Sequence, residues 1–125
     1  MVLVDENVEK EELSRNALQE VAMSAIYDAL TYLSMKQPID VEKILSSLSD
    51  CDYEEVDPYL KATMIYTLKN LDDIKGVFNA NMRKWKFDRL NRVVQSILLL
   101  SYVHYFYVEP DVDKGVVINL SLIHI

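Results

Sequence analysis

The chain has 125 residues, half of them apolar and 26% of them charged, which is the composition of a single globular domain with its own core. Two glycines and three prolines leave little material for hairpin turns, and the lone Cys51 excludes an internal disulfide or a cysteine-based metal site. The formal net charge of −7 argues against nonspecific binding to nucleic acid.

Two helices are expected in the first part of the chain. Between residues 13 and 33 apolar residues recur at steps of three and four, the pattern of one helix face, and Pro38 marks the end of that helix. Asp40 is the expected N-cap of a short second helix, which gives way to the polar stretch 49–55.

A long third helix is expected after this polar stretch. Asp57 is a candidate N-cap, and Pro58 suits the first helical position because its missing N–H costs nothing there. The apolar stripe behind them continues to about residue 82, and Gly76 is the expected weak point of this helix.

The longest apolar stretch, residues 93–108, belongs to the next expected helix, which Asp88 would cap and Pro110 would end. A membrane span needs about 20 apolar residues, so we expect a buried central helix with His104 as a core or helix-edge residue. Asp113 is a candidate cap for one more helix. The sequence therefore predicts an all-α bundle of four helices and the start of a fifth.

Residue groupings that would perform catalysis or bind a metal are missing from the sequence. Gly76 and Gly115 are far apart and cannot form a phosphate-binding loop, and neither an HExxH motif nor paired cysteine and histidine ligands occur. The acidic pairs 54–55 and 72–73 do not share a helix face. We therefore expect no enzyme, no catalytic residue, no metal and no cofactor. The N-terminus has no signal pattern, so the expected location is the cytoplasm.

A cluster of cations with two aromatic residues is the most distinctive feature of the sequence. Residues 83–92 read RKWKFDRLNR, in which Asp88 is the one acid. The cations are Arg83, Lys84, Lys86, Arg89 and Arg92. Cations neutralise phosphates and aromatic faces stack on unpaired bases, so this stretch is a candidate site for single-stranded RNA. Alternatively, it is a helix–helix corner with Trp85 and Phe87 packed inside and the cations facing water.

The same region resembles a known family. The segment LKNLDDIKGVFNANMRK followed by WKFDRLNRVVQSILLLSYVHYFYVEPDVDKGVVIN is similar to the NusB family of bacterial transcription antitermination factors. Residues 22–30, AMSAIYDAL, match the first helix of that family more loosely. The resemblance implies an all-helical bundle that binds the boxA element of RNA together with NusE, a ribosomal protein.

The resemblance also indicates which residues would perform this function. Positive charge near the corner is kept at Lys84, Lys86, Arg89 and Arg92, and with Arg83 these are the candidate RNA contacts. Tyr27 keeps the family's aromatic position on the first helix and is the candidate partner-binding residue. The implied partners are boxA-like RNA and NusE, with no membrane and no cofactor, and a homodimer is left open.

Several polar positions of the family pattern are changed in this chain. The arginine-rich segment with which family members contact RNA corresponds here to a stretch containing Glu9, Glu11, Glu12 and Glu20. Since like charges repel, we expect this acidic stretch to oppose RNA binding. Val94, Leu99 and His104 stand where the family has charged residues, so the usual partner surface is altered as well.

The last six residues depart from the family pattern. After Asn119 the family continues with Glu-Ala and a helix, whereas this chain reads LSLIHI. The codons CTG TCT CTT ATA CAC ATC encode the same residues and resemble the transposase mosaic-end adapter used for sequencing libraries. We therefore expect residues 1–119 to be an incomplete NusB-like domain lacking its C-terminal helices, and residues 120–125 to be adapter read-through.

Three functions remain open on the sequence. The first is a non-catalytic RNA-binding adaptor of the NusB type, acting in transcription antitermination. The second is the N-terminal domain of a ribosomal RNA cytosine methyltransferase, because the same helical module resembles the front domain of some such enzymes. The third is a protein-interaction module without RNA binding, which the acidic N-terminal stretch would permit.

Overall fold

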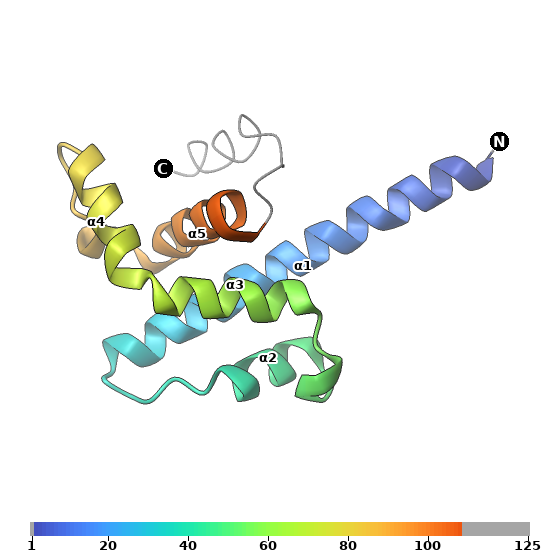
Figure 1. Ribbon diagram of the computed structural model, residues 1–125, viewed down its shortest axis with the longest axis horizontal. Coiled ribbons are helices and arrows are strands. Elements are labelled where there is room, and N and C mark those ends of the chain that lie inside the picture. Colours follow the sequence, from blue (N-terminus) through green and yellow to red (C-terminus); the bar gives the residue numbers. More distant parts are fainter. Residues whose placement is uncertain (1, 109–125) are drawn as a thin grey trace.

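The computed structural model describes the backbone of residues 2–108 and the side chains of residues 15–108 (Figure 1). This part contains helices and loops and no strand, so the predicted all-α class is confirmed. The α-helices are α1 (Val2–Ser34), α2 (Val41–Ser49), α3 (Pro58–Lys69), α4 (Leu71–Asn81) and α5 (Arg92–Val103). Short helical turns are η1 (Tyr53–Glu55), η2 (Phe87–Arg89) and η3 (His104–Val108). The helix expected after Asp113 and the predicted adapter residues 120–125 lie outside the described residues.

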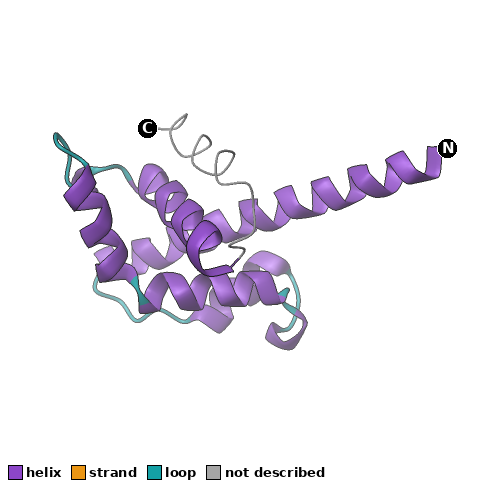
Figure 2. Cartoon of the chain, turned by 45° about the horizontal axis from the view of Figure 1, so that its top comes forward, coloured by secondary structure: helices purple, strands orange, loops and turns teal. Residues whose placement is uncertain are grey.

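Helix α1 is the longest element, and its C-terminal half lies in the bundle. Figures 1 and 2 both show α5 crossing α1, while the N-terminal end of α1 extends away from the other helices. Ala22, Ala25 and Ala29 of α1 are at most 2% exposed and belong to the hydrophobic core. Their small side chains at helical spacing let the neighbouring helices approach the α1 backbone closely.

The helix starts expected at residues 40 and 57 are confirmed. The Asp40 side chain accepts a hydrogen bond from the backbone N–H of Lys43 at 3.1 Å and caps α2. The Asp57 side chain accepts one from the N–H of Tyr59 at 2.8 Å, and Pro58 is the first residue of α3. Each carboxylate thereby satisfies a backbone donor that the start of a helix leaves without an intrahelical partner.

The long helix expected between residues 58 and 82 is instead two helices, α3 and α4. The chain leaves helical geometry at Asn70, where φ is −112° and ψ is 15°. Asn70 Nδ2 donates to the Tyr66 carbonyl at 3.0 Å, a side-chain bond of the kind that competes with the helical ladder. Gly76 lies inside α4, so the weak point was predicted at the wrong residue.

Helix α5 also begins later than expected. Its N-cap is Asn91, whose side-chain oxygen accepts from the N–H of Val94 at 2.9 Å. Asp88, the residue expected to cap this helix, lies in the preceding turn η2. The predicted cap was therefore wrong, because a second capping residue three positions later satisfies the helix start.

The body of α5 is buried, as the sequence predicts. Leu98, Leu99 and Val103 are at most 3% exposed. His104, which follows them, is 7% exposed, and its Nδ1 lies 2.8 Å from the Tyr59 hydroxyl oxygen. The prediction of a core or helix-edge histidine is thus confirmed. Across the part of the chain that the structure describes, each helix is too short or too polar to cross a membrane.

Replacing Gly76 with alanine should stabilise the fold. Gly76 is exposed in the middle of α4, and a Cβ placed there meets no heavy atom within 4 Å. Alanine restricts the unfolded chain and favours the helix, so Gly76→Ala should raise the free energy of unfolding by about 0.5–1 kcal/mol in urea titrations. The exposed Ala80 of the same helix gives a matched control, since Ala80→Gly should lower it by a similar amount. If neither substitution changes the free energy of unfolding, α4 is not formed in solution.

Candidate nucleic-acid interface

The five candidate cations lie in the segment that joins α4 to α5 and includes Arg92, the first residue of α5. We call this segment the basic corner (residues 83–92). Figure 2 shows this connection at one end of the bundle, opposite the projecting N-terminal end of α1. The exposed cations of the corner are Arg83, Lys84, Lys86 and Arg89. An acidic protein therefore presents a compact positive surface at one end of its bundle.

Phe87 anchors the basic corner to the core. Its ring is fully buried and packs on Phe78 of α4, with 5.9 Å between ring centroids. Its backbone N–H donates to Asn79 Oδ1 at 2.7 Å, and its carbonyl accepts from Gln95 Nε2 at 2.9 Å. Side chains from both flanking helices thus satisfy the backbone of one loop residue, which fixes the corner relative to α4 and α5.

The one acid of the corner is paired. Asp88 Oδ1 lies 3.0 Å from Lys75 Nζ of α4, and the same ammonium lies 5.8 Å from the centre of the Phe87 ring. The Asp88 side chain is 73% exposed, so this ion pair contributes little to stability. Its effect on the interface is electrostatic, because Lys75 neutralises the carboxylate that would otherwise repel a phosphate.

Arg92 is placed differently from the four exposed cations. Its Nη1 donates to Thr31 Oγ1 and its Nη2 donates to Ser34 Oγ, both at 3.1 Å. The guanidinium carbon also lies 5.6 Å from the centre of the Tyr27 ring. Arg92 therefore joins the basic corner to the end of α1. It also brings the candidate partner residue Tyr27 next to the candidate RNA surface.

The two aromatic residues of the corner have opposite environments. Phe87 is buried, as the packed-corner interpretation predicts, whereas Trp85 is 60% exposed. Phe87 therefore fits the packed-corner interpretation, and the exposed Trp85 fits the interpretation as an RNA site. One aromatic side chain holds the corner in place, and the other faces water beside the cations.

A cleft of about 300 Å³ adjoins the corner. Its lining residues come from α1, α4, α5 and the loop before α5: Leu30, Leu33, Ser34, Lys75, Asp88, Leu90, Arg92 and Gln95. Two of these side chains are cations and one is an acid, so the cleft is positive on balance. It extends the polar surface of the corner toward the end of α1.

The first part of the acidic N-terminal stretch lies far from the corner along α1. Arg92 contacts Thr31 and Ser34, whereas Glu9, Glu11 and Glu12 lie near the other end of α1. At 1.5 Å of rise per residue, Glu12 and Thr31 are roughly 30 Å apart along the helix. This is several times the Debye length of about 8 Å at physiological salt. Over this distance, screening weakens the repulsion that Glu9, Glu11 and Glu12 would exert on RNA at the corner. Glu20 is closer, roughly 16 Å from Thr31 along α1, and the expectation that the acidic stretch opposes RNA binding stays a prediction.

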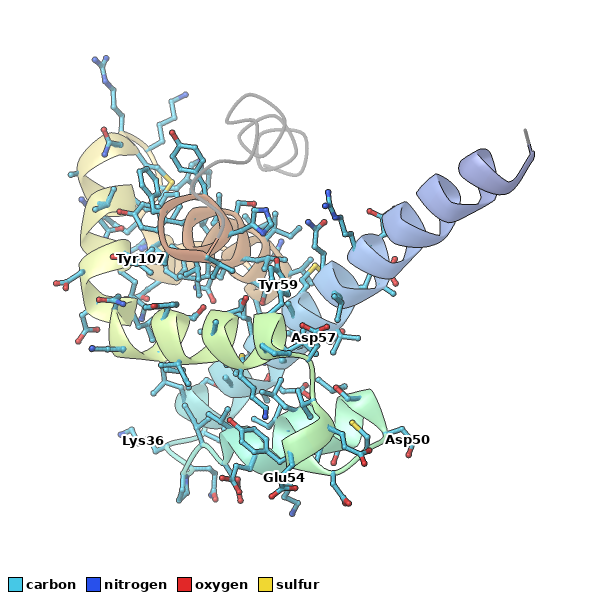
Figure 3. The ribbon with its side chains drawn as sticks, turned by 45° about the vertical axis from the view of Figure 1, so that its right-hand side comes forward. Lys36, Asp50, Glu54, Asp57, Tyr59 and Tyr107 are labelled. Carbon is cyan, nitrogen blue, oxygen red and sulfur yellow. The ribbon has the colours of Figure 1, made fainter. Side chains whose placement is uncertain are left out.

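A second hollow, of about 570 Å³, lies between α1 and α5. Its lining residues are Asn16, Gln19, Glu20, Met23, Tyr59, Val93, Ile97, Leu100, Ser101 and His104. Figure 3 labels Tyr59, which reaches this groove from the N-terminal end of α3. The lining is mostly apolar and its formal charge comes from Glu20, so this groove does not suit a phosphate backbone.

Metal ligands do not gather among the side chains that the structure describes, and the pKa of the Tyr102 phenol is raised. Among residues 15–108, no group of three His, Cys, Asp or Glu side chains is placed to hold a metal ion. Burial raises the pKa of the Tyr102 hydroxyl, and nearby Tyr107 and Asp73 add to that effect.

Comparison with known proteins gives one consistent result. The NusB family model matches residues 16–122. A transcription antitermination protein NusB from Clostridium botulinum is 31% identical over 124 residues, covering 88% of this chain and 84% of the relative. The protein of the same name from Bacillus mycoides is 26% identical, covering 88% and 80%. A third from Exiguobacterium is 34% identical over 68 residues, covering 54% and 52%. No solved structure matches the chain.

Asn79→Ala should loosen the basic corner. The change leaves the N–H of buried Phe87 without its acceptor, so the free energy of unfolding should fall by about 1–2 kcal/mol. Hydrogen exchange at the Phe87 amide should become faster at the same time.

Asn81→Ala is the matched control for this substitution. Asn81 Nδ2 donates to the Val77 carbonyl of its own helix on an exposed surface, so its removal should change stability by at most about 0.5 kcal/mol. If both asparagine substitutions have the same effect, the Asn79 side chain does not hold the corner.

Proposed function

Because this chain belongs to the NusB family, we propose that it binds boxA-like, single-stranded RNA through the basic corner and acts in the cytoplasm with the ribosomal protein NusE. It is a NusB-type transcription antitermination factor, in keeping with the name of each relative described above. The proposal concerns its RNA, its protein partner and the residues that contact each of them.

The chain is a non-catalytic factor rather than an enzyme. The relatives from Clostridium botulinum and Bacillus mycoides are named as antitermination proteins, and the chain matches at least 80% of the length of each. This similarity to nearly whole antitermination proteins favours the adaptor over the front domain of a ribosomal RNA methyltransferase.

The observation that best supports RNA binding is the fixed, positive basic corner. Arg83, Lys84, Lys86 and Arg89 are exposed on a loop whose backbone is held by α4 and α5. Each cation that meets a phosphate releases a counterion, which gives affinity that depends on salt and not on base sequence. A pre-ordered loop also loses less conformational entropy on binding than a free one.

Tyr27 supports the placement of a protein partner. Tyr27 is 37% exposed on α1, and the Arg92 guanidinium lies over its ring. A partner that covers Tyr27 would therefore lie directly beside RNA bound at the corner. This arrangement suits a factor that binds RNA and NusE together, because each ligand can contact the other across Arg92.

Single alanine substitutions of the exposed cations should weaken RNA binding. For Arg83→Ala, Lys84→Ala, Lys86→Ala and Arg89→Ala, we expect the slope of log affinity against log salt to shrink by about 0.7 for each lost phosphate contact. Fluorescence anisotropy of a labelled boxA-like oligonucleotide, titrated at several salt concentrations with and without NusE, measures this slope. Arg92→Ala should lower both RNA affinity and stability, because it also removes the bonds to Thr31 and Ser34.

Lys43→Ala on α2 is the control for these substitutions. Lys43 is an exposed cation on α2, which packs on α1, η1 and α3, so its removal should leave the slope unchanged. If the corner variants behave like Lys43→Ala, the cations are solvated surface and the chain is a protein-interaction module without RNA binding.

Neutralising the acidic stretch should have little effect at physiological salt. With Glu9, Glu11 and Glu12 changed to glutamine, affinity for a short oligonucleotide should stay within about twofold, because the Debye length of about 8 Å screens charges roughly 30 Å away. Near 0.01 M salt the Debye length reaches about 30 Å, and there the triple variant should bind more tightly. A large gain at physiological salt would mean that the RNA runs along α1 and not only over the corner.

A further inference from the structure

Trp85 is the residue of the basic corner for which the fold gives no internal role. It is the single tryptophan of the chain, and 60% of its surface is exposed. It lies in the loop between α4 and η2, at the end of the bundle that Figure 2 shows opposite the projecting end of α1. A large indole left in water on an ordered loop is an unusual feature of a folded surface.

The exposure of Trp85 does not follow from a lack of burial sites near this loop. Two residues later, Phe87 is fully buried against Phe78, so the same loop delivers one aromatic ring to the core. The Phe87 backbone is also fixed on both sides, by Asn79 and by Gln95. Trp85 is therefore held outside the core by a loop with a defined position.

The neighbours of Trp85 specify what kind of ligand would cover it. Arg83, Lys84 and Lys86 flank it in sequence, and all three are exposed. An apolar protein surface would have to desolvate these cations, whereas a polyanion would neutralise them. A ligand that brings negative charge and flat aromatic faces together satisfies both features, and single-stranded RNA has this chemistry.

We propose that Trp85 is a stacking platform for an unpaired base, while the flanking cations contact the phosphates on either side of that base. This inference rests on the proposed RNA binding and adds a residue and a mode of contact to it. Every base has an aromatic face, so stacking is tolerant of sequence. A duplex is a poor ligand for this platform, because its bases are stacked within the helix and their faces are not available.

The first experiment uses the intrinsic fluorescence of the full 125-residue chain. Because Trp85 is the single tryptophan, excitation at the red edge of indole absorption reports on this residue alone. In the free protein, acrylamide should quench the emission efficiently. Oligouridylate should quench it further and then protect it from acrylamide, whereas an abasic oligomer with the same number of phosphates should do neither. A tryptophan that is shielded from acrylamide before RNA is added would overturn the proposal.

The second experiment compares variants by anisotropy of a labelled oligouridylate. Trp85→Leu keeps apolar volume without an aromatic face, and we expect at least about a fivefold loss of affinity, the low end for one base–aromatic stack. Trp85→Phe keeps an aromatic face and should recover part of that loss. Phe106→Leu is the control, because Phe106 is also an aromatic residue, 55% exposed, but follows the opposite end of α5.

The outcomes separate failure of the platform from failure of RNA binding. If the wild-type chain binds base-containing and abasic oligomers with the same affinity and salt slope, the corner binds phosphates but Trp85 does not stack. Trp85→Leu with wild-type affinity leads to the same conclusion. If neither oligomer shows salt-sensitive binding, with or without NusE, the proposed RNA function fails, and the platform with it.

Discussion

The burial of the Phe87 ring is the contact on which the basic corner depends. The basic corner carries five cations within ten residues, so it repels itself, and it has only one short helical turn, η2, before α5 begins at Arg92. Phe87 supplies the order: its ring enters the core beside Phe78, and its backbone N–H and carbonyl bond to Asn79 and Gln95. The exposed cations therefore have a fixed position relative to α4 and α5, and an RNA ligand meets a surface that is already arranged.

Arg92 gives the corner its second attachment and connects the two candidate surfaces. An arginine has five donors in a planar fork, and two of its nitrogens here bond to Thr31 and Ser34 while its plane lies near Tyr27. A phosphate that binds Arg92 and a partner that covers Tyr27 would both change the environment of the Arg92 side chain. If both ligands bind as proposed, the two binding events would be coupled, and the coupling would be reciprocal by thermodynamic necessity.

Local chemistry made the starts of α2 and α3 predictable. Asp40 and Asp57 accept from backbone N–H groups two or three residues away, and Pro58 suits the first helical position because it has no N–H to satisfy. The break at Asn70 was not predictable from periodicity, since the apolar stripe continues from Leu68 to Leu71 across it.

The opposite environments of Trp85 and Phe87 depend on contacts with other helices, which no local pattern records. Thr31, Ser34, Asn79 and Gln95 were missed for the same reason, with partners 8 to 61 residues away in sequence.

The net charge of −7 and an RNA-binding surface are compatible because charge acts locally in salt water. The start of α1 and the connection between α4 and α5 lie at opposite ends of the structure in both ribbon views. At physiological salt, each ligand senses the charges within about one Debye length, so the corner is positive to a phosphate whatever the total charge. At low salt, where the Debye length is longer, the asymmetry would also orient an approaching polyanion toward the corner and away from the start of α1. The distribution of charge, and not its sum, therefore decides whether this chain can bind RNA.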